Sequence, residues 1–202
     1  MNIGVLASTK ATDLQAVIDA IQVNELNAKL SVVISNKEDA YALERARKHN
    51  ILAVFIDSKD KERDEFDREV NDVLENHDVD LVLLIGYMRI LSGWLVNKWR
   101  NKIMNIHPSL LPAFARGMDK DVHAEVLKAG VKETGCTLHF VTEDVDAGPI
   151  IMQKKVDVDE NETVDSLKEK VQKAEQDIIV KTLRLYEQGK IKVNDGKVTI
   201  SK

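Results

Sequence analysis

The feature of this sequence that most constrains its fold is the alternation of short apolar runs with amphipathic stretches through its first half. Five runs rich in branched aliphatic residues are bounded by polar or turn-forming residues, as buried strands are. A strand–helix–strand series takes right-handed crossovers, which gives a parallel sheet with helices on both faces. The predicted strands are Asn2–Ser8, Leu30–Ser35, Ala53–Asp57, Leu81–Gly86 and Lys102–Asn105.

Three amphipathic helices are predicted between these strands. The first begins at Thr12, where Thr12-Asp13-Leu14-Gln15 fits a capping box with Gln15 reaching back to the cap. The other two are Asp39–His49 and Asp60–His77, and the second of them carries one apolar stripe.

After residue 130 the pattern changes from strand–helix alternation to paired strands followed by one long helix. A turn at Ala147-Gly148-Pro149 separates two of these strands, and Asn194-Asp195-Gly196 is typical of a terminal hairpin. Because the chain has no internal repeat and no linker rich in Pro, Gly or Ser, we expect a single α/β domain spanning residues 1–202. The predicted elements are strands Thr137–Thr142 and Ile150–Val156, helix Val164–Glu187, and hairpin strands Ile191–Val193 and Lys197–Ile200.

Charge and composition limit the classes of molecule that the protein can be expected to bind. The formal net charge of −5 argues against nucleic acid or an anionic membrane as the main partner, because both select a basic surface. The apolar runs are far shorter than a membrane span, and Met1 leads into a strand without the pattern of a signal peptide. The single cysteine, Cys136, cannot form an internal disulfide. We therefore expect a cytoplasmic protein that binds small molecules.

The carboxyl ends of the predicted strands are the expected ligand side, because open α/β sheets bind ligands there. All three prolines of the chain lie in two of the loops that reach this side. The four converging segments are Ser8–Asp13, Gly86–Leu91, Asn105–Pro112 and, by a longer route, Thr142–Pro149.

Asn105 and His107 leave the fifth strand two positions apart, so they share a face. An amide donor beside an imidazole suits a carbonyl that becomes a tetrahedral oxyanion, because the amide stabilises charge and the imidazole moves a proton. The alternative is a histidine that is packed at a strand end, with Asn105 closing the turn. Asp146, held by the following Gly-Pro turn, is a candidate to orient His107, although the same segment also fits a solvated acidic turn.

Other chemistry has weaker support. The five histidines show no metal-binding spacing, so no metal site is predicted. Cys136 lies in an alternating strand and fits a small buried side chain better than a nucleophile. Ser109 has no nucleophile elbow around it, and no Gly-x-Gly-x-x-Gly occurs, which disfavours dinucleotide binding.

The run Asn105-Ile106-His107-Pro108-Ser109-Leu110-Leu111-Pro112, followed by His139-Phe140-Val141 and Asp146-Ala147-Gly148-Pro149, resembles the glycinamide ribonucleotide formyltransferase family. The likeness runs through essentially the whole chain. It implies a formyltransferase fold with a Rossmann-like N-terminal half. Residues of about 1–100 form the nucleotide-binding half, and residues of about 101–202 form the catalytic and folate-binding half.

The same resemblance implies a set of site residues. The catalytic residues are Asn105, His107 and Asp146. The residues implied to hold the co-substrate, 10-formyltetrahydrofolate, are Arg63, Met88, Arg89, Ile90, Leu91, Asn105, Thr142 and Asp144. Those implied for the phosphorylated amine are Lys10, Ala11, Thr12, Asp13, Pro108 and Glu175.

The chain departs from the family pattern in two places. The first-strand loop of the family reads Gly-x-Gly-Ser-Asn, whereas this chain has Lys10, Ala11 and Asp13 in that region. Ala11 loses freedom at positive φ, and Asp13 adds a negative charge where a phosphate binds. We hypothesise that Lys10 offsets this charge; the alternative is a solvated loop lysine. The second departure is Gln176, which follows Glu175 where the family usually has a histidine.

The expected reaction is formyl transfer from 10-formyltetrahydrofolate to the amine of glycinamide ribonucleotide, in de novo purine synthesis, by a monomer or homodimer. Two rivals use the same scaffold: a formyltetrahydrofolate hydrolase and a sugar N-formyltransferase. A non-catalytic folate- or nucleotide-binding module is the rival from another class, and its support is the altered first loop.

Overall fold

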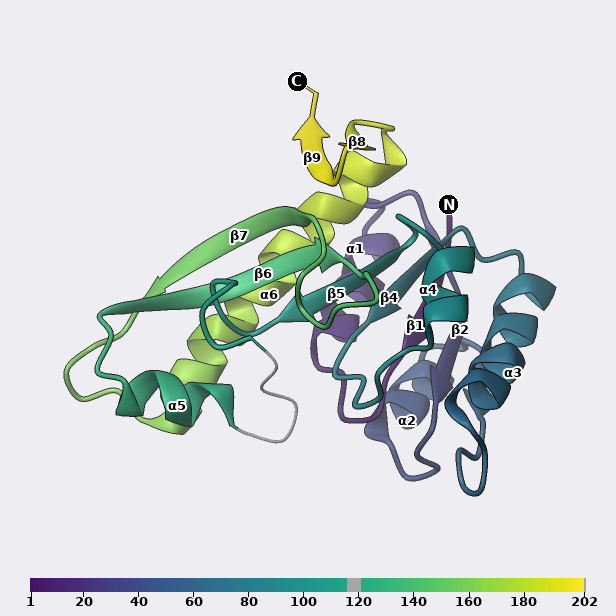
Figure 1. Ribbon diagram of the computed structural model, residues 1–202, viewed down its shortest axis with the longest axis horizontal. Coiled ribbons are helices and arrows are strands. Elements are labelled where there is room, and N and C mark those ends of the chain that lie inside the picture. Colours follow the sequence, from purple (N-terminus) through teal and green to yellow (C-terminus); the bar gives the residue numbers. More distant parts are fainter. Residues whose placement is uncertain (116–120, 202) are drawn as a thin grey trace.

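A computed structural model describes residues 1–115 and 121–201 of the chain. They form one α/β domain around a seven-stranded sheet with the order β3-β2-β1-β4-β5-β6-β7, and a separate two-stranded hairpin lies near the C-terminus (Figure 1). The sheet strands are β1 (Asn2–Leu6), β2 (Lys29–Ser35), β3 (Ala53–Phe55), β4 (Leu81–Leu84), β5 (Ile103–His107), β6 (Glu133–Phe140) and β7 (Ile150–Asp157), and the hairpin is β8 (Ile191–Asn194) with β9 (Lys197–Ile200).

The predicted α/β class and mainly parallel sheet are confirmed. The first five strands pair in parallel, whereas β6 and β7 are antiparallel to their neighbours. The antiparallel pairing of β6 with β7 follows from the sequence, because these two strands are joined by a loop that contains a Gly-Pro turn instead of a crossover helix.

Helices cover both faces of the sheet. The helices are α1 (Asp13–Gln22), α2 (Tyr41–Lys48), α3 (Arg63–Asn76), α4 (Gly93–Lys98), α5 (Val122–Lys128) and α6 (Val164–Glu187). The buried residues of α1, α2, α5 and α6 pack on one face, and those of α3 and α4 pack on the other.

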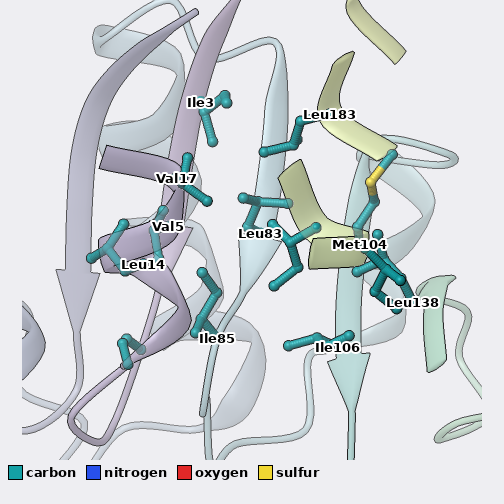
Figure 2. Close-up of a cluster of buried hydrophobic side chains, with 14 of the residues drawn as sticks. Ile3, Val5, Leu14, Val17, Leu83, Ile85, Met104, Ile106, Leu138 and Leu183 are labelled. Carbon is teal, nitrogen blue, oxygen red and sulfur yellow. The ribbon is translucent and has the colours of Figure 1, made fainter. Parts of the chain in front are cut away.

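Alternation along the buried strands builds the two cores. On β1, Ile3 and Val5 face the core shared with α1 and α6, while Leu6 faces the core shared with α3. On β4, Leu83 lies in the first core and Leu84 in the second, so these strands are apolar on both sides. Figure 2 shows the first core, where side chains from β1, β4, β5 and β6 meet those of α1 and α6.

Two details of the sequence prediction are wrong. Thr12 already has helical backbone angles (φ −62°, ψ −33°) and makes no side-chain cap, so the predicted capping box is absent there. Gln15 instead donates to Asp19 at 2.8 Å and accepts from Arg45 at 2.6 Å. The short helices α4 and α5 were not predicted, because six and seven residues are too few to show a clear period.

Candidate active site

A cavity of about 420 Å³ opens where β4 and β5 end. Residues 86–91, which follow β4, form one wall, and the end of β5 forms another. The loop 141–146 after β6 closes a third side, and the beginning of α5 closes the fourth. Three of the four segments predicted to converge therefore line one cavity, at the sheet edge where ligands of such folds bind.

Asn105 and His107 are both on β5 and both line this cavity, because residues two apart on a strand share a face. The strand ends at His107, since the following Pro108 cannot donate to the ladder. The predicted common orientation of the two side chains is thus explained by the strand itself.

The imidazole of His107 is buried between two acceptors. Its Nε2 lies 3.0 Å from the carbonyl oxygen of Phe114, and its Nδ1 lies 3.5 Å from Oδ2 of Asp146. A carbonyl and a carboxylate only accept hydrogen bonds, so an imidazolium with both nitrogens protonated satisfies both. The arrangement allows His107 to act as a charged donor toward a developing oxyanion.

Asn105 is oriented by His139, which pairs with it across β5 and β6. Nδ1 of His139 lies 2.9 Å from the carbonyl oxygen of Phe140, so Nδ1 carries the proton and Nε2 is the acceptor. The Asn105 amide nitrogen lies 3.2 Å from that Nε2 and donates to it. The second N–H of the amide remains to serve a ligand in the cavity.

Burial keeps His139 in this neutral form. Desolvation lowers its pKa, and this effect exceeds the opposing effects of the Phe140 carbonyl and of Asp146, whose Oδ1 lies 3.7 Å from Nε2. A neutral His139 is the tautomer that can accept from Asn105.

The cavity contains some of the expected site residues and leaves others outside its lining. The lining includes Asn105, His107, Pro108, Asp146, Met88, Arg89, Ile90, Leu91, Thr142 and Asp144. The expected residues outside the lining are Arg63, Lys10, Ala11, Thr12, Asp13 and Glu175. Arg63 and Lys10 are exposed side chains, at the start of α3 and in the first-strand loop respectively.

Six polar residues of the cavity lining were not predicted as site residues: Tyr87, Asp121, His123, His139, Glu143 and Lys168. The antiparallel pairing of β5 with β6 brings His139 beside Asn105, and strand registry is not visible in a single sequence. His123 lies at the start of α5, where burial lowers the pKa of its ring, and its Nδ1 has no hydrogen-bond partner within the part of the chain that the structure describes.

The first-strand loop lies beside the cavity wall. The hydroxyl of Ser8 accepts from the backbone of Met88 at 2.9 Å and donates to Asn36 at 2.6 Å, which ties this loop to residues 86–91. Ala11 adopts φ 43°, so the left-handed turn expected of a glycine is kept by an alanine at some cost in strain.

The sequence suggests that Asp13 places a negative charge where a phosphate binds, but its side chain is not open to solvent. It is buried, and its pKa is raised to about 6, mainly by desolvation. Glu175 on α6 is also buried; its pKa is raised well above the usual value, first by desolvation and then by Asp13. The two carboxyls therefore belong to one buried group behind the loop.

Within residues 1–115 and 121–201, no group of three or more histidine, cysteine or acidic side chains is arranged to hold a metal ion. The prediction that the site needs no metal stays a prediction. In the same part of the chain, every helix is too short or too polar to span a bilayer.

Fold and site together define an α/β protein with a cavity at the strand ends, lined by an asparagine amide beside a histidine. The model of the formyl transferase family matches residues 1–183. The chain belongs to the formyl transferase family, which confirms the resemblance noted in the sequence.

The names of individual relatives agree with this family assignment. The chain is 44% identical over 195 residues to the trifunctional purine biosynthetic protein adenosine-3 of Bos taurus; this match covers 96% of the chain but 19% of that protein. It is 38% identical to the phosphoribosylglycinamide formyltransferase of Escherichia coli K12, covering 97% of the chain and 92% of the relative. The crystal structure of glycinamide ribonucleotide transformylase 1 from Symbiobacterium toebii superposes with a TM-score of 0.95, at 40% identity, over 100% of this chain and 94% of that one.

Proposed function

We propose that the chain transfers the formyl group of 10-formyltetrahydrofolate to the amine of glycinamide ribonucleotide, a step of purine biosynthesis. The proposal is supported by the name and near-complete coverage of the Escherichia coli relative. The observation that carries it is the meeting of Asn105, His107 and Asp146, from two distant segments, at one cavity.

The acceptor amine attacks the formyl carbon and forms a tetrahedral intermediate with a negative oxygen. The free N–H of Asn105 and the imidazolium of His107 donate to that oxygen, and both can be in place before the reaction begins. The Nε2 proton of His107 is held by the neutral Phe114 carbonyl, and an oxyanion is the stronger acceptor for it.

His107 can carry the proton that the reaction moves from one nitrogen to the other. The amine nitrogen becomes positively charged when it bonds to the formyl carbon and then loses a proton, and the leaving folate nitrogen gains one when the C–N bond breaks. A histidine beside the oxyanion can give a proton to the leaving nitrogen and recover one from the acceptor amine. Asp146, 3.5 Å from Nδ1, stabilises the charged ring throughout.

Several narrower assignments are part of the same proposal. Residues 88–91 and 142–144 hold the folate against the cavity walls, with Arg63 near the folate outside the cavity lining. The first-strand loop, including Lys10, Ala11, Thr12 and Asp13, receives the phosphate, while Pro108 and Glu175 contact the acceptor. The cytoplasm is the proposed compartment, the protein a monomer or homodimer, and residues of about 1–100 and 101–202 form its two functional halves.

One assay separates this function from its rivals. Purified protein is mixed with 10-formyltetrahydrofolate, with and without glycinamide ribonucleotide, and tetrahydrofolate and formate are both measured. We expect tetrahydrofolate to appear when the amine is present, in equal amount to formylated amine. Formate released without the amine indicates a hydrolase. Binding of the folate without any product indicates a non-catalytic module, and either result contradicts the proposal.

A further inference from the structure

The two departures from the family pattern meet each other in space. Asp13 is the first residue of α1, and Gln176 lies in the middle of α6, which packs beside α1. The side chain of Gln176 lies close enough to the Asp13 carboxyl to lower its pKa. Because Glu175 precedes Gln176, the altered loop and the altered helix position surround the same acidic group.

The carboxyls of Asp13 and Glu175 are both withdrawn from water. Asp13 is 6% exposed and Glu175 is 8% exposed. Oδ1 of Asp13 is buried and has no hydrogen-bond partner among residues 1–115 and 121–201. Buried acidic side chains normally have a full set of donors, so this vacancy indicates that a proton or a ligand completes the group.

Few charges near the pair can compensate two negative charges. Arg45 of α2 attracts Asp13, but its guanidinium also donates to Gln15 at 2.6 Å and lies 5.3 Å from the ring centroid of Tyr41. From β6, Cys136 faces Glu175, and burial raises the pKa of its thiol to about 12, so it is neutral. Within the described residues, Arg45, which also contacts Gln15 and Tyr41, is therefore the one cation near the carboxyls of Asp13 and Glu175.

Two carboxylates in such a place cannot both ionise at low cost, and one of them keeps its proton near neutral pH. Burial raises the pKa of Asp13, and burial together with the charge of Asp13 raises that of Glu175. These directions agree with the geometry of two enclosed acids and one partial cation.

We propose that Asp13 and Glu175 share one proton at neutral pH, and that Asp13 is thereby a positioning residue for Glu175 in acceptor binding. This inference rests on the proposed function, which assigns Glu175 to the acceptor. The shared proton leaves a single negative charge on the pair, and the proton stays mainly on Glu175, whose pKa is raised the more, while Asp13 carries the charge. Loss of that proton places a second negative charge behind the loop that receives the phosphate.

Asp13→Asn tests the proposal because its amide cannot ionise and so removes the charge that raises the pKa of Glu175. The KM for the acceptor is measured from pH 6 to pH 9 in the parent and the variant. Ionisation of the acceptor itself affects both proteins equally, so the ratio of the parent KM to the variant KM isolates the pair. We expect this ratio to rise with pH, by about tenfold for each pKa unit of coupling. A ratio that is independent of pH contradicts the proposal.

Two further variants separate positioning from a merely structural role. Asp13→Ala removes both the charge and the hydrogen-bonding group, so its KM for the acceptor rises more than that of Asp13→Asn, whose amide keeps a hydrogen-bonding group at this position. Asp19→Asn is the matched control, because Asp19 is exposed on the same helix; its KM ratio is flat. Equal behaviour of Asp13→Ala and Asp13→Asn overturns the positioning role.

A titration of the ligand-free protein decides the shared proton without any assay of activity. The ¹³C chemical shifts of the two side-chain carboxyl carbons are followed with pH by NMR. We expect one of the two carboxyls to remain protonated at pH 7 and the pKa of Glu175 to fall in Asp13→Asn. Two fully ionised carboxyls at pH 7 overturn the inference. If formyl transfer to glycinamide ribonucleotide fails but this titration succeeds, the proposed function fails and the shared proton stands.

Discussion

The two sides of the proposed site differ in how closely they follow the family. At the end of β5, Asn105, His107 and Asp146 lie together as the motif predicts, and His139 fixes the amide. In the first-strand loop, Ala11 replaces a turn glycine and Asp13 is a buried acid. Under the proposed function, the comparison predicts that the chemistry of the formyl group is kept while the contacts with the acceptor differ from those of the family.

The largest effect on activity is expected from a substitution at the end of β5, where the chain follows the family. His107→Ala removes the imidazolium that donates to the oxyanion and moves the proton. We expect kcat to fall by about 10²–10⁴-fold, with a circular dichroism spectrum and melting temperature close to those of the parent. A folded variant with near-normal kcat breaks the assignment of His107.

Asn105→Ala is expected to give the next largest fall in kcat. Loss of one oxyanion donor typically lowers kcat by about 10²–10³-fold. Asn105→Asp keeps the shape but replaces the donor with an anion, so its kcat falls further. Steady-state kinetics at saturating substrates measure both, and equal activity of the aspartate variant and the parent contradicts a donor role.

His139→Leu tests the orientation of Asn105 through its neighbour. The substitution keeps an apolar side chain of similar size but leaves the amide without its acceptor. We expect kcat to fall by about 10- to 100-fold because a loosely placed donor stabilises the oxyanion poorly. The effect should vanish in an Asn105→Ala background, and full additivity of the two changes contradicts the coupling.

In the first-strand loop, Asp13→Asn is expected to change the stability of the fold in a pH-dependent way. The folded pKa of about 6 lies above the ordinary aspartate pKa of 3.8, so ionisation favours the unfolded chain. The parent therefore loses stability as pH rises from about 4 to about 6, by roughly 1–3 kcal/mol, and stays at the lower level above that range.

The asparagine variant lacks this loss, because its amide does not ionise. The free energies of unfolding in urea at pH 5 and pH 8 measure the difference. Relative to the parent, the variant should be more stable at pH 8 than at pH 5. The opposite order means that Asp13 is stabilised as an anion in the folded protein.

Lys10→Ala is expected to give the smallest effect. Lys10 is exposed, and a solvated cation contributes about 1 kcal/mol or less to holding an anion. The KM for the phosphorylated acceptor should rise a few-fold, while the KM for the folate stays as in the parent. An unchanged KM for the acceptor shows that the backbone and Thr12 hold the phosphate without Lys10.

The sequence predicted the parallel half of the sheet well, because strands such as β1 and β4 are buried on both faces and read as continuous apolar runs. Long helix α6 was predicted to its exact ends, since twenty-four residues carry a clear period. Thr12 was predicted to cap α1 from local pattern alone, and the turn at Ala11 decided otherwise.

The site was predictable only where residues are neighbours on one strand. Asn105 and His107 follow from the alternation of β5, whereas His139 depends on strand registry. The burial of Asp13 against Glu175 depends on the packing of α1 on α6, over more than 160 residues of chain. Such long-range contacts leave no periodic signal in a single sequence, so they had to come from the structure.

A crystal structure with a stable 10-formyl folate analogue tests the central claim most directly. The measured quantity is the distance from the formyl oxygen to the Asn105 amide nitrogen and to the nearer ring nitrogen of His107. We predict that both distances lie at about 2.7–3.1 Å, as for donors placed around a developing oxyanion. A formyl group bound elsewhere, for example in the cavity of about 570 Å³ beside β8 and β9, contradicts the account.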